Sequence, residues 1–231
     1  MELYIYDLET TGLGETARII EICILNVKSK EIFYRKVNPE MHIPEESTKI
    51  HGMKDEDVAT SPILKDVLVE MIQFCSIPGK DDKYCCLAAH NNFNFDKRIL
   101  RAEAWRVGIT LPKWRYLDTL RLVKNVYPDF TSYKLINLKE HFGIVQGRDH
   151  SAKDDVMSLY LLYTIWSKGK TLKECYKISK NYVYTKMPFG KYRGYAFSDI
   201  PEDYLDWLKR TMLDEPRHKD LRKALRVAGK L

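Results

Sequence analysis

The stretch Tyr4-Ile5-Tyr6-Asp7-Leu8-Glu9-Thr10-Thr11-Gly12 places two acids inside an apolar, strand-like run. Asp7 and Glu9 are two residues apart, so on a strand both side chains point to one face. Buried carboxylates are costly unless something neutralises them, and a divalent cation does so. An edge strand with solvated acids is the alternative, but the dense apolar neighbours argue against it. The stretch therefore predicts a central strand that carries a metal site.

Outward from this strand, the apolar pattern predicts a mixed sheet. Residues 2–8, 19–27 and 32–37 are three strand-like runs with short links, which predicts an antiparallel meander. Pro39 and Pro44 then mark a loop. Beyond it we expect strands at 84–89 and 115–117 and helices at 62–75, 95–107, 119–126, 135–142, 152–167 and 171–182. A meander followed by alternating helices and strands is typical of an α/β fold with antiparallel and parallel strands.

The pattern of predicted secondary structure changes near Thr185. Residues 187–198 predict a glycine-punctuated hairpin, and residues 201–212 and 217–228 predict two helices. We expect a first domain over residues 1–170, a helix or linker over 171–185, and a small module over 186–231.

Charge is distributed unevenly along the 231 residues. The formal net charge is +6, but residues 1–167 have a net charge of −2 and residues 168–231 have +8. A basic end suggests a polyanionic partner such as nucleic acid. The five cysteines have neither disulfide nor zinc spacing, and no apolar run is long enough for a membrane span. With no signal peptide expected, we predict a cytoplasmic, reduced protein that does not enter membranes.

A second acidic motif, Asn92-Phe93-Asn94-Phe95-Asp96, follows an expected buried strand and opens a helix. Either Asn92 or Asn94 could cap that helix, which would place Asp96 in its first turn. Taken alone, Asp96 fits an acid that complements the helix dipole.

The third motif is His150-Ser151-Ala152-Lys153-Asp154-Asp155. Ser151 and Asp154 have the spacing of a capping box, which gives Asp154 a structural role. Asp155 heads an apolar stripe formed by Leu159, Leu162 and Trp166, so its carboxylate needs a metal or a buried partner. His150 falls just outside the helix; a lone histidine there fits a surface loop equally well.

Together these residues resemble the DEDDh 3′→5′ exonuclease family, which has an RNase H-like fold. The resemblance covers residues 3–166 and rests on five short patterns in order, at Asp7–Gly12, Ile20–Ile22, Ile50–Gly52, Asn92–Asp96 and His150–Asp155. Each pattern is weak alone, and their joint occurrence is specific. The family often has His-Asn before the second motif, but here His90 stands one residue early and Asn91 takes its place. The local end of the strand is therefore expected to differ.

The resemblance implies hydrolysis of phosphodiesters with two divalent ions, Mg²⁺ or Mn²⁺. It implies that Asp7 bridges both ions, that Glu9 and Asp155 complete the ligands of the first, and that Asp96 supports the second. His150 would be the general base, since an imidazole pKa of about 6.5 suits that role.

The same resemblance implies a set of substrate contacts. The backbone after the first strand would hold the terminal 3′-hydroxyl, and Leu13 would pack on the last base, although Leu13 could equally be a core residue beside a turn. His51 would contact the terminal nucleotide, or cap a helix, or be exposed. The expected substrate-binding residues are Thr10, Thr11, Gly12, Leu13, His51 and Asn92.

The C-terminal segment Met187–Leu208 resembles the extra domain of the bacterial exonuclease X group. Lys191, Tyr192 and Arg193 lie on its expected turn, where basic and aromatic groups suit phosphate contact and base stacking. Phe189, Tyr192, Tyr204, Trp207 and Leu208 could also form a small core with solvated basic residues around it, and both interpretations can hold.

The sequence predicts a 3′→5′ exodeoxyribonuclease that acts on single-stranded and double-stranded DNA, releases nucleoside 5′-monophosphates and serves repair. Three alternatives stay open: an RNA-trimming exonuclease of the same family, a non-catalytic nucleic-acid-binding module on this fold, and a proofreading subunit of a polymerase.

Overall fold

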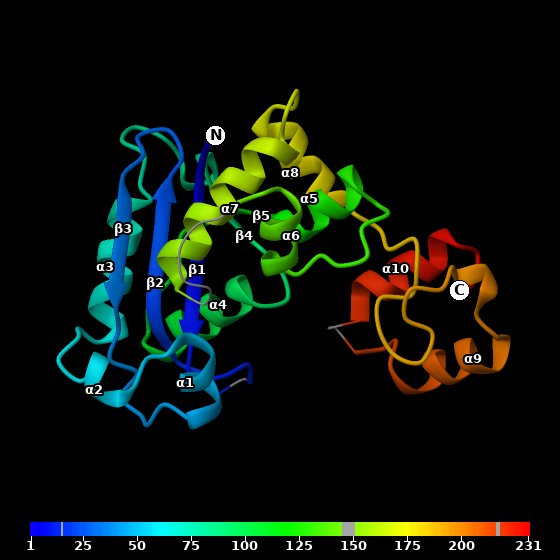
Figure 1. Ribbon diagram of the computed structural model, residues 1–231, viewed down its shortest axis with the longest axis horizontal. Helices are drawn as coiled ribbons and strands as arrows, with labels where there is room; N and C mark the ends of the chain where they lie inside the picture. The colour runs from blue at the N-terminus through cyan, green and yellow to red at the C-terminus, as the bar shows by residue number, and fades with distance from the viewer. Residues whose placement is uncertain (15, 145–150, 216–217) are drawn as a thin grey trace. The chain divides into compact units, whose positions relative to one another are not determined.

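A mixed sheet of five strands, in the order β3-β2-β1-β4-β5, forms the centre of the main unit (Figure 1). β1 (Glu2–Thr10) pairs antiparallel with β2 (Ile19–Asn26), and β2 pairs antiparallel with β3 (Ile32–Lys36). β4 (Cys85–Ala89) and β5 (Arg115–Asp118) run parallel to β1. The mixed α/β sheet is confirmed. The structure is a computed structural model that describes residues 1–14, 16–144, 151–215 and 218–231.

β1 extends beyond its neighbour β4. Its pairing with β2 continues to Thr10, with a shift of register between Glu9 and Thr10, whereas its pairing with β4 stops at Ile5. The end of β1, which contains Asp7 and Glu9, is therefore held by a strand on one side only.

Helices cover both faces of the sheet, and the side chains of β1 alternate between them. Tyr4, Tyr6 and Leu8 pack in one core with α3 (Leu64–Phe74) and α4 (Asp96–Arg106). Leu3 and Ile5 pack in a second core with α5 (Thr119–Val126), α6 (Leu135–His141), α7 (Ala152–Trp166) and α8 (Leu172–Asn181). Among the described residues no helix is both long and apolar enough to cross a membrane.

Pro39 and Pro44 lie in a loop, as expected, and two short helices that were not predicted follow it. α1 (Glu45–His51) begins after Pro44, has Glu46 in its first turn, and ends at Gly52, whose φ of 77° is left-handed. α2 (Asp55–Val58) follows directly. An acid in the first turn and a glycine after the last turn are the local signals that bound α1.

The chain divides into two compact units, Met1–Lys180 and Asn181–Leu231. In the second unit, α9 (Glu202–Thr211) and α10 (Lys219–Val227) enclose a core that includes Met187, Phe197 and Leu205. The chain reverses in the predicted hairpin segment: an antiparallel bridge joins Lys186 to Ala196, and the Met187 N–H donates to the Tyr195 carbonyl at 2.8 Å, although residues 187–198 form no extended strand.

The aromatic residues of this unit are divided between its core and its surface. Phe189, Tyr192 and Tyr204 pack against the core as expected, whereas Trp207 is 46% exposed and contacts the Tyr204 ring at 5.4 Å between centroids.

Candidate active site

Three carboxylates meet where β1 ends and α7 begins. Asp7, Glu9 and Asp155 each present an oxygen within 4.8 Å of the other two. All three are partly buried. Residues 148 positions apart in the chain thus form one acidic cluster.

The packing of β1 and α7 brings these acids together. Asp7 and Glu9 continue the row of Leu3 and Ile5, which faces α7. On α7, the stripe that follows Asp155 is buried as its spacing predicted: Leu159 is 1% exposed, and Leu162 and Trp166 are 0% exposed. Burial of each such side chain contributes about 1.5–3 kcal/mol, which fixes the helix and with it the position of Asp155.

Asp96 lies beside the cluster at the first position of α4 and is 2% exposed. The backbone N–H of Leu8 donates to its carboxylate, and its charge acts on Asp7 more strongly than that of any other acid. Phe95 is the N-cap residue of α4 and makes no side-chain cap bond, so neither Asn92 nor Asn94 caps the helix.

The acids repel one another in a partly dehydrated site. Burial, followed by the charges of Asp96, Glu9 and Asp155, raises the pKa of Asp7 well above its usual value. Burial, followed by the charge of Glu21, raises the pKa of Glu9 to about 8. Burial also raises the pKa of Asp96 to about 8. Without a compensating cation these groups therefore retain protons at neutral pH.

The donor set fits a hard divalent cation. Asp7, Glu9 and Asp155 offer only carboxylate oxygens, which Mg²⁺ and Mn²⁺ prefer, and no sulfur or imidazole belongs to the cluster of described residues. A bound cation would also relieve the repulsion that raises the pKa values.

Glu21 is an acid of the site to which the sequence analysis gave no role. It lies opposite Glu9 on β2 and is 4% exposed. Its Oε1 accepts from the Tyr34 hydroxyl at 2.5 Å, and its Oε2 accepts from the Ala152 N–H at 3.0 Å. Glu21 thus caps the N-terminus of α7 from a neighbouring strand, where a helix leaves N–H groups without intrahelical partners.

The expected capping box does not form. Ser151 holds the N-cap position of α7 but makes no side-chain cap bond, and the side-chain bond at this helix end is the one from the Ala152 N–H to Glu21. The predicted general base, His150, lies outside the described residues.

The loop after β1 presents an apolar tip beside the cluster. The Thr10 hydroxyl donates to the Gly12 carbonyl at 2.6 Å, and the Ser47 hydroxyl of α1 donates to the Thr11 carbonyl at 2.9 Å. Leu13 is 75% exposed, so the alternative of a core residue is wrong.

Two other predicted contact residues are buried. His51 is 5% exposed, which excludes the solvent-exposed alternative, and its Nδ1 accepts from the Met53 N–H at 3.1 Å. Asn92 is 0% exposed; its Oδ1 accepts from the Tyr6 hydroxyl at 2.6 Å, and its Nδ2 donates to the Leu117 carbonyl at 2.8 Å. The Asn92 amide therefore fastens β1, β4 and β5 together and has no exposed atom to offer a substrate.

Asp118 and His90 support the turn that leads to Asp96. Asp118 is 1% exposed, and its carboxylate accepts from the Phe93 N–H at 3.1 Å. His90 contacts the Thr119 hydroxyl at 3.1 Å and the Tyr133 carbonyl at 2.8 Å. Asn91, which follows β4 at the point where the sequence departs from the family pattern, adopts a left-handed φ of 66°.

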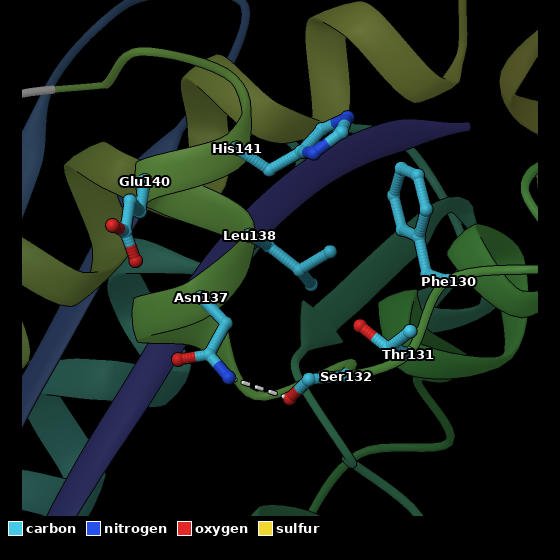
Figure 2. Close-up of a pocket in the computed structure, with 7 residues that line it drawn as sticks. All are labelled: Phe130, Thr131, Ser132, Asn137, Leu138, Glu140 and His141. Carbon is cyan, nitrogen blue, oxygen red and sulfur yellow. Dashed lines mark hydrogen bonds between the residues drawn. The ribbon is translucent and has the colours of Figure 1, made fainter.

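A separate hollow of about 470 Å³ lies between α6 and the segment before it. Figure 2 shows the Phe130 and His141 rings near one another and the Asn137 amide bonded to Ser132 (Figure 2). None of the predicted site residues lines it; its walls are Phe130, Thr131, Ser132, Asn137, Leu138, Glu140 and His141.

Comparison with known proteins identifies the family. The family profile RNase_T, described as "Exonuclease", matches residues 4–163. The chain belongs to the RNase_T exonuclease family. This confirms the resemblance stated from the motifs. A second profile, described as "Putative quorum-sensing-regulated virulence factor", matches residues 176–217, which extend into the second unit.

Curated relatives include a polymerase and an exonuclease. The chain is 34% identical over 158 residues to a PolC-type DNA polymerase III of Caldanaerobacter subterraneus subsp. tengcongensis, covering 67% of this chain and 11% of the relative. It is 27% identical over 190 residues to the 3′-5′ exonuclease DinG of Bacillus subtilis, covering 78% of this chain and 20% of the relative. The chain thus spans a minor part of both relatives.

Solved structures share the fold. A structure of exonuclease X with 5′-overhanging duplex DNA matches with a TM-score of 0.58 at 21% identity, covering 77% of this chain and 99% of that one. The nuclease domain of 3′hExo, a DEDDh family member bound to rAMP, matches with a TM-score of 0.58 at 18% identity, covering 73% and 92%.

Removing one charge from the cluster should change the pH dependence of stability. The folded-state pKa of Glu9, about 8, exceeds the unfolded value of about 4.3, so ionisation costs stability as pH rises through that window. In EDTA, we expect the thermal midpoint of Glu9→Gln minus that of the wild type to increase between pH 5 and pH 8. Mg²⁺ at a hundred times its Kd should add about 2.7 kcal/mol to the wild type and less to the variant. The control is Asp66→Asn, which removes an exposed acid from α3. A wild-type thermal midpoint that does not change on addition of Mg²⁺ or Mn²⁺ would contradict the metal site.

Loss of Glu21 should expose the start of α7. In Mg²⁺, Glu21→Ala leaves the buried Ala152 N–H without its acceptor, so exchange of that amide for deuterium should accelerate at least about tenfold, as expected for a bond worth about 1.5–3 kcal/mol. Tyr34→Phe keeps this bond and should leave the Ala152 exchange rate near the wild-type value. Equal exchange in all three proteins would show that Glu21 does not cap the helix.

Proposed function

We propose that the protein is a metal-dependent 3′→5′ exodeoxyribonuclease that releases nucleoside 5′-monophosphates from DNA. The observation that carries this proposal is the cluster of Asp7, Glu9 and Asp155, within 4.8 Å of one another in an exonuclease-family unit. The name of DinG supports the 3′→5′ direction.

Each acid has a proposed role. Asp7 would bridge two divalent ions, Glu9 and Asp155 would complete the ligands of the first, and Asp96 would support the second. When bound, the ions would stabilise the charge that builds on the phosphate and the leaving 3′ oxygen. His150 would accept the proton of the attacking water. The Thr10–Gly12 backbone would hold the terminal 3′-hydroxyl, and exposed Leu13 would pack on the last base.

DNA is the proposed substrate because one curated relative is a DNA polymerase by name, and exonuclease X was solved with duplex DNA. The rAMP bound to 3′hExo keeps RNA as the alternative. A role in DNA repair is part of the proposal. The five cysteines are free and buried, which supports residence in a reducing cytoplasm.

The second unit would contact nucleic acid through its basic turn. Lys191 and Arg193 are exposed between Gly190 and Gly194, whose φ angles are 76° and 88°. The Lys191 ammonium lies 5.3 Å from the Tyr192 ring centroid. The two glycines adopt the left-handed backbone that a tight turn needs, and the turn leaves both cations in solvent. Cations exposed in this way can contact phosphates.

Adjacent acids on α7 provide a matched test of the mechanism. Asp155→Ala and Asp7→Ala should lose at least about a hundredfold in single-turnover rate, because each removes a ligand from the cluster. His150→Ala should lose about 10²–10⁴-fold. Asp154→Ala should cleave at nearly the wild-type rate, since Asp154 lies outside the cluster.

The assay uses 5′-labelled single-stranded DNA, duplex DNA and RNA with Mg²⁺, and resolves the products over time. A ladder that shortens from the 3′ end and disappears in EDTA is expected, with DNA degraded faster. Unchanged rates in Asp7→Ala, Asp155→Ala and His150→Ala would overturn the mechanism. Binding without cleavage of any substrate would favour the non-catalytic module.

The basic turn is tested by Lys191→Ala with Arg193→Ala. This double variant should weaken binding of duplex DNA about three- to tenfold at moderate salt and reduce the salt slope of log K by about two, because two phosphate contacts are lost. Cleavage of a dinucleotide should not change. The control is Lys209→Ala, since Lys209 already pairs with Asp206 at 3.0 Å; an equal loss in the control would assign the effect to net charge alone.

A further inference from the structure

The outer face of α4 is a basic and aromatic stripe. Arg98, Arg101 and Trp105 are exposed and follow one another at intervals of three and four residues, so they lie on one side of the helix. Trp105 is 84% exposed, more than any other large hydrophobic side chain among the described residues. The other exposed residue of α4 is Ala102, so no acid neutralises the stripe from its own helix.

The stripe starts at the candidate active site. α4 begins at Asp96, and the Arg98 guanidinium donates to the Leu13 carbonyl at 2.8 Å. Leu13 is the exposed tip of the loop that follows Asp7 and Glu9. From Asp96 to Trp105 the helix rises by about 13 Å, at about 1.5 Å per residue. That length corresponds to about four nucleotides of a stacked strand.

Internal packing does not account for the far end of the stripe. Within the described part of the chain, Arg101 makes no side-chain hydrogen bond or ion pair, and the Trp105 ring makes no aromatic contact. A guanidinium that is free to reach a phosphate, one helical turn from an exposed indole, matches the chemistry of a polyanion with stackable bases.

We propose that Arg98, Arg101 and Trp105 bind the DNA strand upstream of its 3′ end. The guanidiniums contact successive phosphates, and the indole stacks on a base about four nucleotides from the terminus. This inference rests on the proposed function and adds a track that holds the strand while its end occupies the carboxylate cluster. The track would make cleavage depend on substrate length.

Two α4 variants test this track without altering the cluster. Arg101→Ala and Trp105→Ala should each weaken binding of a 12-nucleotide single strand about 5- to 100-fold, as expected for loss of a phosphate contact or a base stack. Arg101→Ala should also reduce the salt slope of log K by about one. Trp105→Phe should restore much of the lost binding, because the ring still stacks. Binding is measured by fluorescence anisotropy in Ca²⁺.

Substrate length separates this role from a general structural defect. In Mg²⁺, KM for the 12-mer should rise in both alanine variants, whereas kcat/KM for the p-nitrophenyl ester of thymidine 5′-monophosphate should match wild type. Lys65→Ala and Val69→Ala are the matched controls, since they remove an exposed cation and an exposed apolar side chain from α3.

The outcomes distinguish the two proposals. If both α4 variants bind the 12-mer with the same affinity and KM as the wild type, and the wild type cleaves DNA, the track is overturned and the proposed function is not. Absence of cleavage by the wild type would overturn the proposed function, and the Ca²⁺ binding data would still decide whether the stripe holds DNA. A change of oligomeric state in Trp105→Ala, with DNA binding intact, would assign the stripe to a second copy of the chain and also overturn the track.

Discussion

Mutual repulsion between Asp7, Glu9 and Asp155 is the constraint to which the surrounding structure responds. Like charges whose oxygens lie within 4.8 Å of one another in a partly dehydrated site raise the free energy of the folded chain. Burial, followed by the charges of Glu21 and Asp155, raises the pKa of Glu9 there. Such a cluster stays in place only because the elements that carry it are fixed by other interactions. The sheet and α7 supply these interactions through two apolar cores, one on each face of β1.

Residues outside the carboxylate cluster hold its members in position. Glu21 adds another acid to an already acidic region, yet it anchors the start of α7 through Ala152 and is itself bonded to Tyr34. Asn92 and Asp118 similarly fix the turn that ends in Asp96. An additional buried acid is electrostatically unfavourable near the site, but its hydrogen bonds hold the site residues in fixed positions. This is common where binding or catalysis needs a defined geometry.

Much of this arrangement could be predicted from local pattern. The two-residue spacing of Asp7 and Glu9 and the stripe below Asp155 each specify a direction relative to the core, and both directions hold in the structure. What local pattern could not give was the long-range pairing. Ser151 had the sequence of a capping residue, but its side chain makes no cap bond, and the carboxylate that binds the helix end belongs to Glu21, 131 positions before Ala152. Burial of Asn92 also depends on β5, whose position relative to β4 no local motif encodes.

The short pairing between β1 and β4 has a consequence for Asp96, the acid beside the cluster. Where β4 no longer pairs with β1, beyond Ile5, the N–H of Leu8 donates to the Asp96 carboxylate. Asp96 therefore completes the backbone ladder of the sheet in place of a strand residue. The strand edge and the acid are mutually dependent: an extension of β4 by a few residues would take the same N–H and displace Asp96. The length of one strand thereby controls whether a carboxylate stands at that position.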